Sequence, residues 1–98
     1  MAWSFREATD EFGRALVGER GASRHTVAAY LADLEEFRRS YAARRERDPE
    51  PASVDTADLR AYLATLFGRV DASSISRKLS SLRAFFRFLV RRGEVNDN

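Results

Sequence analysis

Proline occurs at only two positions in this 98-residue chain, 49 and 51, close together near its middle. Proline interrupts an α-helix because it has no N–H to donate and its ring collides with the preceding turn. The long stretches on either side lack this breaker, and they are rich in alanine and poor in β-branched residues. These features predict an all-α chain with one substantial loop, near residues 44–50.

Apolar residues recur at helical spacing in four segments, which predicts helices near residues 5–19, 24–44, 57–67 and 74–92. Residues that favour a helix start precede these segments, and glycines follow three of them. The predicted starts are Ser4 with Glu7 as a capping box, Ser23, Thr56, and Ser73 or Ser74, and the predicted stops are Gly21, Gly68 and Gly93.

Four amphipathic helices joined by short connections bury their apolar stripes by forming one compact bundle, and 98 residues suffice for a single domain over 1–98. Phe85 and Phe88 lie outside the last stripe, and we expect the first helix or a neighbour to bury them. The predicted stripes are Phe5, Ala8, Phe12, Ala15 and Leu16; Val27, Tyr30, Leu31, Leu34, Phe37 and Tyr41; Leu59, Tyr62, Leu63, Leu66 and Phe67; and Ile75, Leu79, Leu82, Phe86 and Leu89.

The composition excludes several classes of protein. The chain has no cysteine and one histidine, so neither a disulfide framework nor a thiolate or histidine-cluster metal site is expected. It has no apolar run long enough to span a membrane, and its first residues lack the layout of a signal peptide. We therefore expect a soluble cytoplasmic protein with no metal, cofactor or small-molecule substrate.

The sequence offers no convincing catalytic group. His25 is the single imidazole, so a Ser/His/Asp arrangement has one candidate base, near the positive end of its helix. Carboxylate pairs occur at Glu35-Glu36 and at Asp55 with Asp58, but such pairs are common on solvated helix faces. No glycine-rich phosphate loop is present. We predict no catalytic residue in this chain, which is then not itself an enzyme.

Positive charge gathers at the C-terminal end of the chain. Residues 1–71 hold eleven arginines against thirteen acids, net −2, whereas residues 72–98 hold six cations against two acids, net +4. From Ala72 to Gly93 there is no acid at all. This pattern favours a polyanionic partner, although a solvated helix face would produce it as well.

Small and cationic side chains lie opposite the stripe of the fourth predicted helix, and small ones lie on the outer face of the second. Such a surface allows close approach to a DNA groove, and hydroxyl and guanidinium groups can bond phosphates. The alternative is that the alanine face of the second helix (Ala28, Ala29 and Ala32), with Phe88, packs on another protein as a helical interaction module. The predicted DNA contacts are Ser23, His25, Thr26, Ser74, Arg77, Lys78 and Ser81.

Three segments in order resemble one family. Residues 19–34, ERGASRHTVAAYLADL, resemble the ERG-x-S-x-HT-x-x-x-Y-x-x-DL signature of Xer-type tyrosine recombinases. Residues 73–89, SSISRKLSSLRAFFRFL, resemble that family's S-I-x-R-x-LS-x-LR-x-F helix, and residues 56–63, TADLRAYL, match its linking helix. The closing Asp97-Asn98 resembles the start of the family's D-N-P. The resemblance covers essentially the whole chain.

The resemblance implies the N-terminal, SAM-like core-binding domain of a site-specific recombinase. In that family the second and fourth helices lie against the major groove, and the first helix often helps subunits meet in a synaptic tetramer. A separate C-terminal domain cuts DNA through a phosphotyrosine linkage. The expected partners are double-stranded DNA and further recombinase subunits, and the catalytic positions would lie beyond Asn98. The implied role is DNA recombination in chromosome dimer resolution and partition, with a phage or mobile-element integrase as the alternative. Relatives often carry arginine where this chain has Ala28, Leu31 or Ala32, so its second helix is expected to make fewer phosphate contacts.

Overall fold

Four α-helices make up most of residues 2–96, the part of the chain that the computed structural model describes. They are α1 (Phe5–Arg20), α2 (Arg24–Arg45), α3 (Thr56–Leu66) and α4 (Ala72–Arg91), and a single 3-10 turn, η1 (Pro51–Ser53), lies in the long loop. No strand occurs in the described residues, which confirms the all-α prediction. Asp97-Asn98, the pair that resembles the family's D-N, lies outside them.

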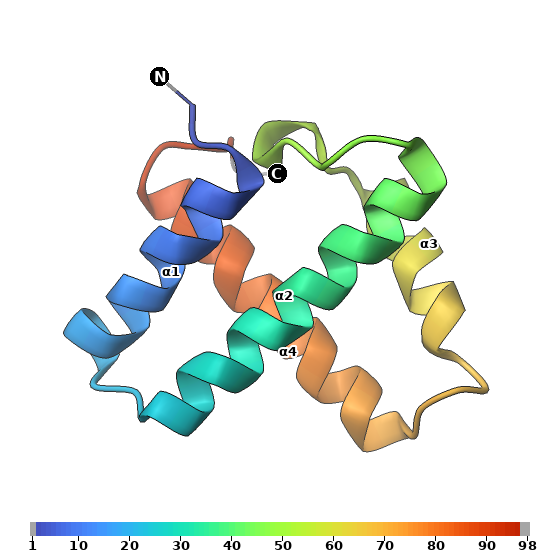
Figure 1. Ribbon diagram of the computed structural model, residues 1–98, viewed down its shortest axis with the longest axis horizontal. Coiled ribbons are helices and arrows are strands. Elements are labelled where there is room, and N and C mark those ends of the chain that lie inside the picture. The colour runs from blue at the N-terminus through green and yellow to red at the C-terminus, as the bar shows by residue number, and fades with distance from the viewer. Residues whose placement is uncertain (1, 97–98) are drawn as a thin grey trace.

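The two longest helices cross each other near their middles, with α2 in front of α4 in Figure 1. Helix α1 packs on both α2 and α4 at one side of the crossing, and α3 packs on α2 at the other. The first turns of α2 and α4 both lie on the lower side of the molecule, at opposite corners of the view (Figure 1). The fold therefore places the first halves of these two helices on one side.

The helix starts follow from side chains that accept the unpaired N–H groups of a first turn. Ser4 and Glu7 form the predicted capping box, and the Ser23 hydroxyl accepts from the Thr26 amide. The prediction that α4 begins at Ser73 or Ser74 is wrong, because the Asp71 carboxylate caps it, accepting from the Ser74 amide at 2.8 Å. The helix consequently starts at Ala72.

The core is built largely from aromatic rings. All five residues of the predicted α1 stripe are buried, and Phe5 and Phe12 meet the ring of Phe85 edge-on at 5.4 and 5.5 Å. Phe85 and Phe88 are both buried, and α1 supplies the contacts, as expected. Phe67 is 68% exposed, against the prediction, because α3 ends at Leu66 and the chain turns extended at Phe67.

The buried face of α4 is rotated from the predicted stripe. Ala84, predicted on the outer surface, is buried, whereas Ile75, Leu79 and Phe86 are only half-buried. The rotation follows from α4 packing against α2 and α1 together, which buries a broader arc than a single neighbour would.

Residues 2–96 hold no helix with both the length and the apolar character needed to cross a membrane.

Candidate nucleic-acid interface

The outward sides of the first halves of α2 and α4 carry most of the predicted DNA contacts. We call this surface the open face and define it as Ser23, His25, Thr26, Ala29, Ala32, Ser74 and Arg77. Ser23, His25, Ala32 and Arg77 are exposed, and Thr26, Ala29 and Ser74 are half-buried. Residues far apart in the sequence are therefore brought to one side of the molecule, as Figure 1 shows for the helix starts that bear them.

The hydroxyls at the start of α2 divide their roles. Ser23 Oγ accepts from the Thr26 amide at 3.1 Å and donates to Thr26 Oγ1 at 3.0 Å. Ser23 thus uses its hydroxyl to cap the helix, and the Thr26 hydroxyl proton has no acceptor within residues 2–96. The first-turn amides that remain unpaired add partial positive charge at the same place.

A buried carboxylate lies where α2 and α4 cross. Asp33 of α2 is 4% exposed, and it accepts from three side chains of α4. Ser81 Oγ donates to Asp33 Oδ2 at 2.8 Å, and Arg77 Nη2 donates to Oδ1 at 3.0 Å. Lys78 Nζ lies 3.5 Å from the same Oδ1. Burying a carboxylate is costly unless it is paired and hydrogen-bonded, and these donors provide that compensation.

Two predicted contact residues do not lie on the surface. Ser81 is fully buried and Lys78 is 8% exposed, so the expectation that both face outward is wrong. Both turn toward acids of α2: Ser81 toward Asp33, and Lys78 toward Asp33 and Glu36, whose Oε1 is 2.9 Å from Nζ. In this arrangement both side chains are bound to acids of α2.

Arg77 combines a fixed position with exposure. Its side chain is 53% exposed although Nη2 is bonded to Asp33. A guanidinium carries five N–H donors, and this bond uses one. Within residues 2–96, Nε and Nη1 of Arg77 have no hydrogen-bond partner. Arg77 is therefore a cation at the open face with donors left for an anion.

Asp33 is the residue of this site that the sequence-based prediction missed. It lies three residues after Tyr30 and four before Phe37, which places it at the edge of an apolar stripe. An acid at that spacing is a signal for a buried carboxylate that needs cationic partners. The partners themselves are 44 to 48 residues away in the sequence, and no local pattern identifies them.

The polar cluster extends to α3 through Glu36. Tyr62 donates its hydroxyl to Glu36 Oε1, the oxygen that also faces Lys78. Burial opposes ionisation of Glu36, but the hydrogen bonds from Tyr62 and Lys78 outweigh it, so its pKa lies below the ordinary value. Burial, together with the charge of Glu36, raises the pKa of Tyr62. The cluster thus ties α3 and α4 to α2.

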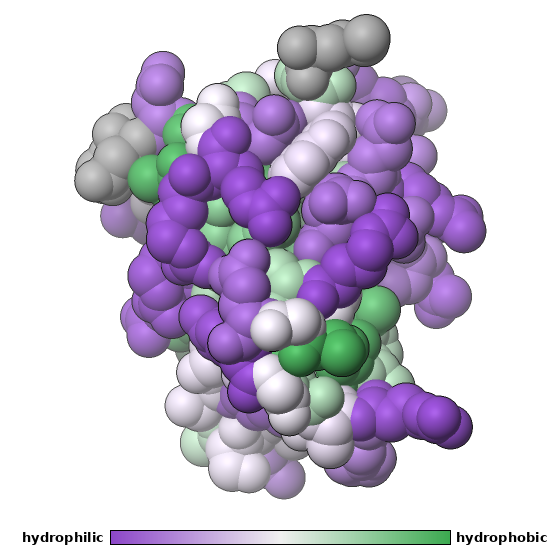
Figure 2. All heavy atoms as spheres, turned by 90° about the vertical axis from the view of Figure 1, so that its left-hand side faces the viewer, coloured by the Kyte–Doolittle hydropathy of each residue, from purple (hydrophilic) through white to green (hydrophobic). Residues whose placement is uncertain are grey.

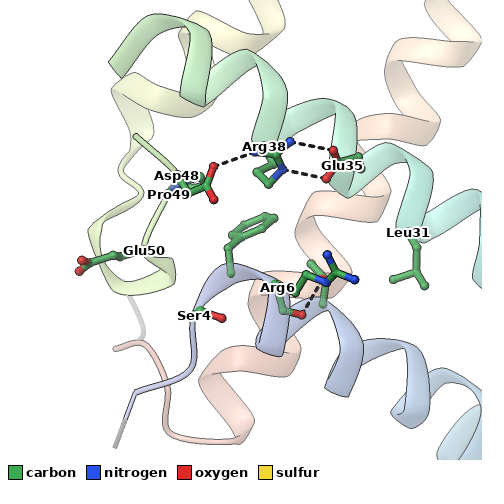
Figure 3. Close-up of a pocket in the computed structure, with 10 residues that line it drawn as sticks. Ser4, Arg6, Leu31, Glu35, Arg38, Asp48, Pro49 and Glu50 are labelled. Atoms are coloured by element: carbon green, nitrogen blue, oxygen red, sulfur yellow. Dashed lines mark hydrogen bonds and ion pairs between the residues drawn. The ribbon is translucent and has the colours of Figure 1, made fainter. Parts of the chain in front are cut away.

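The other carboxylates named in the sequence are bound to arginines. Asp58 accepts from Arg44 and Arg45, and Glu35 accepts from Arg38, which also reaches Asp48. Figure 3 shows Arg38 between these two acids, beside a hollow of about 500 Å³ between α1, α2 and residues 48–50. No group of three metal-ligating side chains forms within the described residues. These acids hold segments together.

The remaining cations of α4 and of its C-cap are distributed around the helix. Arg92 pairs with Glu19, whereas Arg83, Arg87 and Arg91 are exposed and have no carboxylate within ion-pair distance in residues 2–96. Arg83 follows Arg77 by six residues, which is about 120° around the helix. The positive charge noted in the sequence is therefore spread over more than one surface.

Comparison with known proteins identifies the family to which this chain belongs. Residues 9–93 match the family model described as phage integrase, N-terminal SAM-like domain, and this chain belongs to that family. It is 42% identical over 80 residues to tyrosine recombinase XerC of Pelobacter propionicus, covering 82% of this chain and 26% of that protein. It is 41% identical to XerC of Rhodospirillum centenum over 93% of this chain, and 40% identical to tyrosine recombinase XerD of Rhizobium meliloti over 91%, in each case covering 28% of the relative.

The chain thus spans less than a third of the length of these curated relatives. No solved structure matches it.

Proposed function

We propose that this chain is the DNA-binding module of a site-specific tyrosine recombinase, holding duplex DNA against the open face. The observation that carries the proposal is Arg77, a half-exposed cation held where α2 and α4 cross. Ala29 and Ala32 of α2 have short side chains, so a groove edge can approach the helix closely. Arginine beside small residues suits both phosphate contact and the acceptor edge of guanine.

The relatives named tyrosine recombinase XerC and XerD support a wider role. We propose that the parent protein is an enzyme whose catalytic residues lie outside this chain, and that it acts in the cytoplasm on chromosomal DNA to resolve dimers. Integration of a phage or another mobile element is the second candidate, favoured by the name of the matching family model.

Further recombinase subunits are the proposed protein partners. Helix α1 offers them a small apolar area, since Val17 is 56% exposed and lines a shallow hollow with Val27 and Leu31. Figure 2 shows the face that contains α1 as mainly hydrophilic, with apolar atoms gathered low on it. Contact between recombinase subunits in a synaptic tetramer would cover such an area.

Binding to duplex DNA at several salt concentrations tests the proposal. For a mixed-sequence duplex of about 30 base pairs, roughly three turns, we expect the binding constant to fall steeply as salt rises. Arg77→Ala should weaken binding about three- to tenfold. It should also reduce the slope of the logarithm of the binding constant against the logarithm of the salt concentration by about one, because one phosphate contact is lost.

Arg83→Ala is the matched control, since it removes the same charge from an exposed position of the same helix. Its effect should be clearly smaller than that of Arg77→Ala. Equal losses for both variants would mean that net charge, and not the open face, determines binding. Absence of salt-dependent binding in the unsubstituted protein would favour the alternative, a protein-interaction module that uses the alanine face of α2.

A further inference from the structure

We propose that Asp33 is a positioning residue for DNA binding, acting through Arg77. The inference rests on the proposed function and adds a residue that itself touches no DNA. Asp33 lies on α2 and Arg77 on α4, so their bond fixes a cation of one helix relative to the surface of the other. A guanidinium already held at the crossing would meet the duplex with less loss of side-chain freedom.

The geometry separates what Asp33 does for Arg77 from what it does for its other partners. Oδ2 accepts from the buried Ser81 hydroxyl, so this contact does not involve the oxygen that faces Arg77. Oδ1 is then aimed at Arg77 Nη2 and Lys78 Nζ, at 3.0 and 3.5 Å. Lys78 is also bound by Glu36, whereas Arg77 has Asp33 as its single acidic partner in residues 2–96. Loss of Asp33 would therefore release Arg77 above all.

Net charge alone and a positioning role predict opposite effects of removing Asp33 on DNA binding. DNA repels a carboxylate, so Asp33→Asn, which makes the domain one charge more positive, should tighten binding if only charge matters. If Asp33 positions Arg77, the same substitution should weaken binding. The direction of the change thus distinguishes the two explanations.

A double-mutant cycle with the mixed-sequence duplex tests this. We expect Asp33→Asn to weaken binding about three- to tenfold when Arg77 is present, and to leave it unchanged or tighter when residue 77 is alanine. A purely structural role would weaken binding in both backgrounds. Tighter or unchanged binding by Asp33→Asn in the presence of Arg77, or equal losses in both backgrounds, would overturn the proposal.

Ser81→Ala is the matched control, because it removes another hydrogen bond of the same carboxylate and leaves the Arg77 bond in place. We expect it to destabilise the fold, as seen in denaturant unfolding, while the affinity for DNA stays within twofold. A loss of affinity as large as that of Asp33→Asn would show that any disturbance of the crossing suffices, and the proposal would be wrong.

If Asp33→Asn does not fold, Arg77→Lys tests the same contact while leaving Asp33 intact. Lysine keeps the charge but has one ammonium, which cannot bond Asp33 and also present a separate fork of donors outward. We expect it to bind almost as weakly as Arg77→Ala, and binding equal to that of the unsubstituted protein would overturn the proposal. If Arg77→Ala has no effect, the proposed function fails at this face. If Arg77→Ala weakens binding and Asp33→Asn does not, only the positioning role fails.

Discussion

Individual buried acidic side chains hold pairs of helices together in this domain. Asp58, 1% exposed at the start of α3, accepts from the guanidinium groups of Arg44 and Arg45 at the end of α2 and from the Asp55 amide. Burial works against the charge of Asp58, but these hydrogen bonds and the nearby positive charges lower its pKa to about 2 from an ordinary 3.8. The Asp58 carboxylate thus completes the capping box of α3 with Asp55 and binds α3 to α2.

Acid should therefore destabilise the protein through Asp58. A carboxylate whose pKa is lower in the folded state than in the unfolded chain stabilises the fold at pH values above the unfolded-state pKa. This stabilisation is lost as the pH falls through the folded-state pKa. The free energy of unfolding should drop by about 2 kcal/mol between about pH 5 and pH 2 on account of this group. Asp58→Asn should remove a similar amount at neutral pH and flatten the acid dependence, as measured by urea unfolding at a series of pH values.

Glu35→Gln is the control for that experiment. Arg38 and Arg39 lower the pKa of Glu35 to about 2 as well, against a smaller opposing effect of burial, but its side chain is 43% exposed. Ion pairs in contact with water contribute little, so this substitution should change the acid dependence much less. An equal effect of the two substitutions would mean that burial of Asp58 does not strengthen its contacts.

At the scale of the helices, the start of α4 decides how the open face is presented, because Ser74 and Arg77 lie in its first two turns. Asp71→Ala should lower the melting temperature by a few degrees, since the Ser74 amide loses its acceptor, whereas Asp71→Asn, which keeps a capping oxygen, should lower it less. Ser73→Ala, at an exposed position, should have the smallest effect. A larger effect of Ser73→Ala would instead favour the helix start predicted from the sequence. Thermal unfolding followed by circular dichroism measures all three.

Sequence periodicity predicted α1 better than α4, and the neighbours explain why. The stripe of α1 faces α2 and α4 on one side, so its five apolar residues define the buried arc. Helix α4 is covered by α2 and α1 from different directions, which brings Ala84 and Ser81 inside. Ser81 can be buried because Asp33, 48 residues away, accepts its hydroxyl proton. The sequence was enough to identify the two helix faces of the candidate site, but the division between its inner and outer residues depends on that distant partner.

At the scale of the whole molecule, aromatic contacts join all four helices. Phe37 of α2 lies 6.1 Å from Phe5 of α1 and 5.4 Å from Tyr62 of α3, and Phe5 in turn meets Phe85 of α4. Helix α3 packs on α2 and reaches the rest of the core through this chain of rings and through the Asp58 and Glu36 contacts. Its attachment decides whether the domain unfolds as one unit.

Phe37→Ala tests whether the four helices unfold together. Removing a buried phenylalanine costs about 3–5 kcal/mol, a large part of the roughly 5–15 kcal/mol expected for a domain of this size. Because Phe37 touches both α1 and α3, we expect one transition at a much lower urea concentration, with helicity and the fluorescence of Trp3, which stacks on Phe88, changing together. Phe67→Ala, at a 68% exposed position, should leave the midpoint nearly unchanged. A separate early loss of helicity with Trp3 fluorescence intact would instead mean that α3 detaches by itself, and the open face would then depend on α1, α2 and α4 alone.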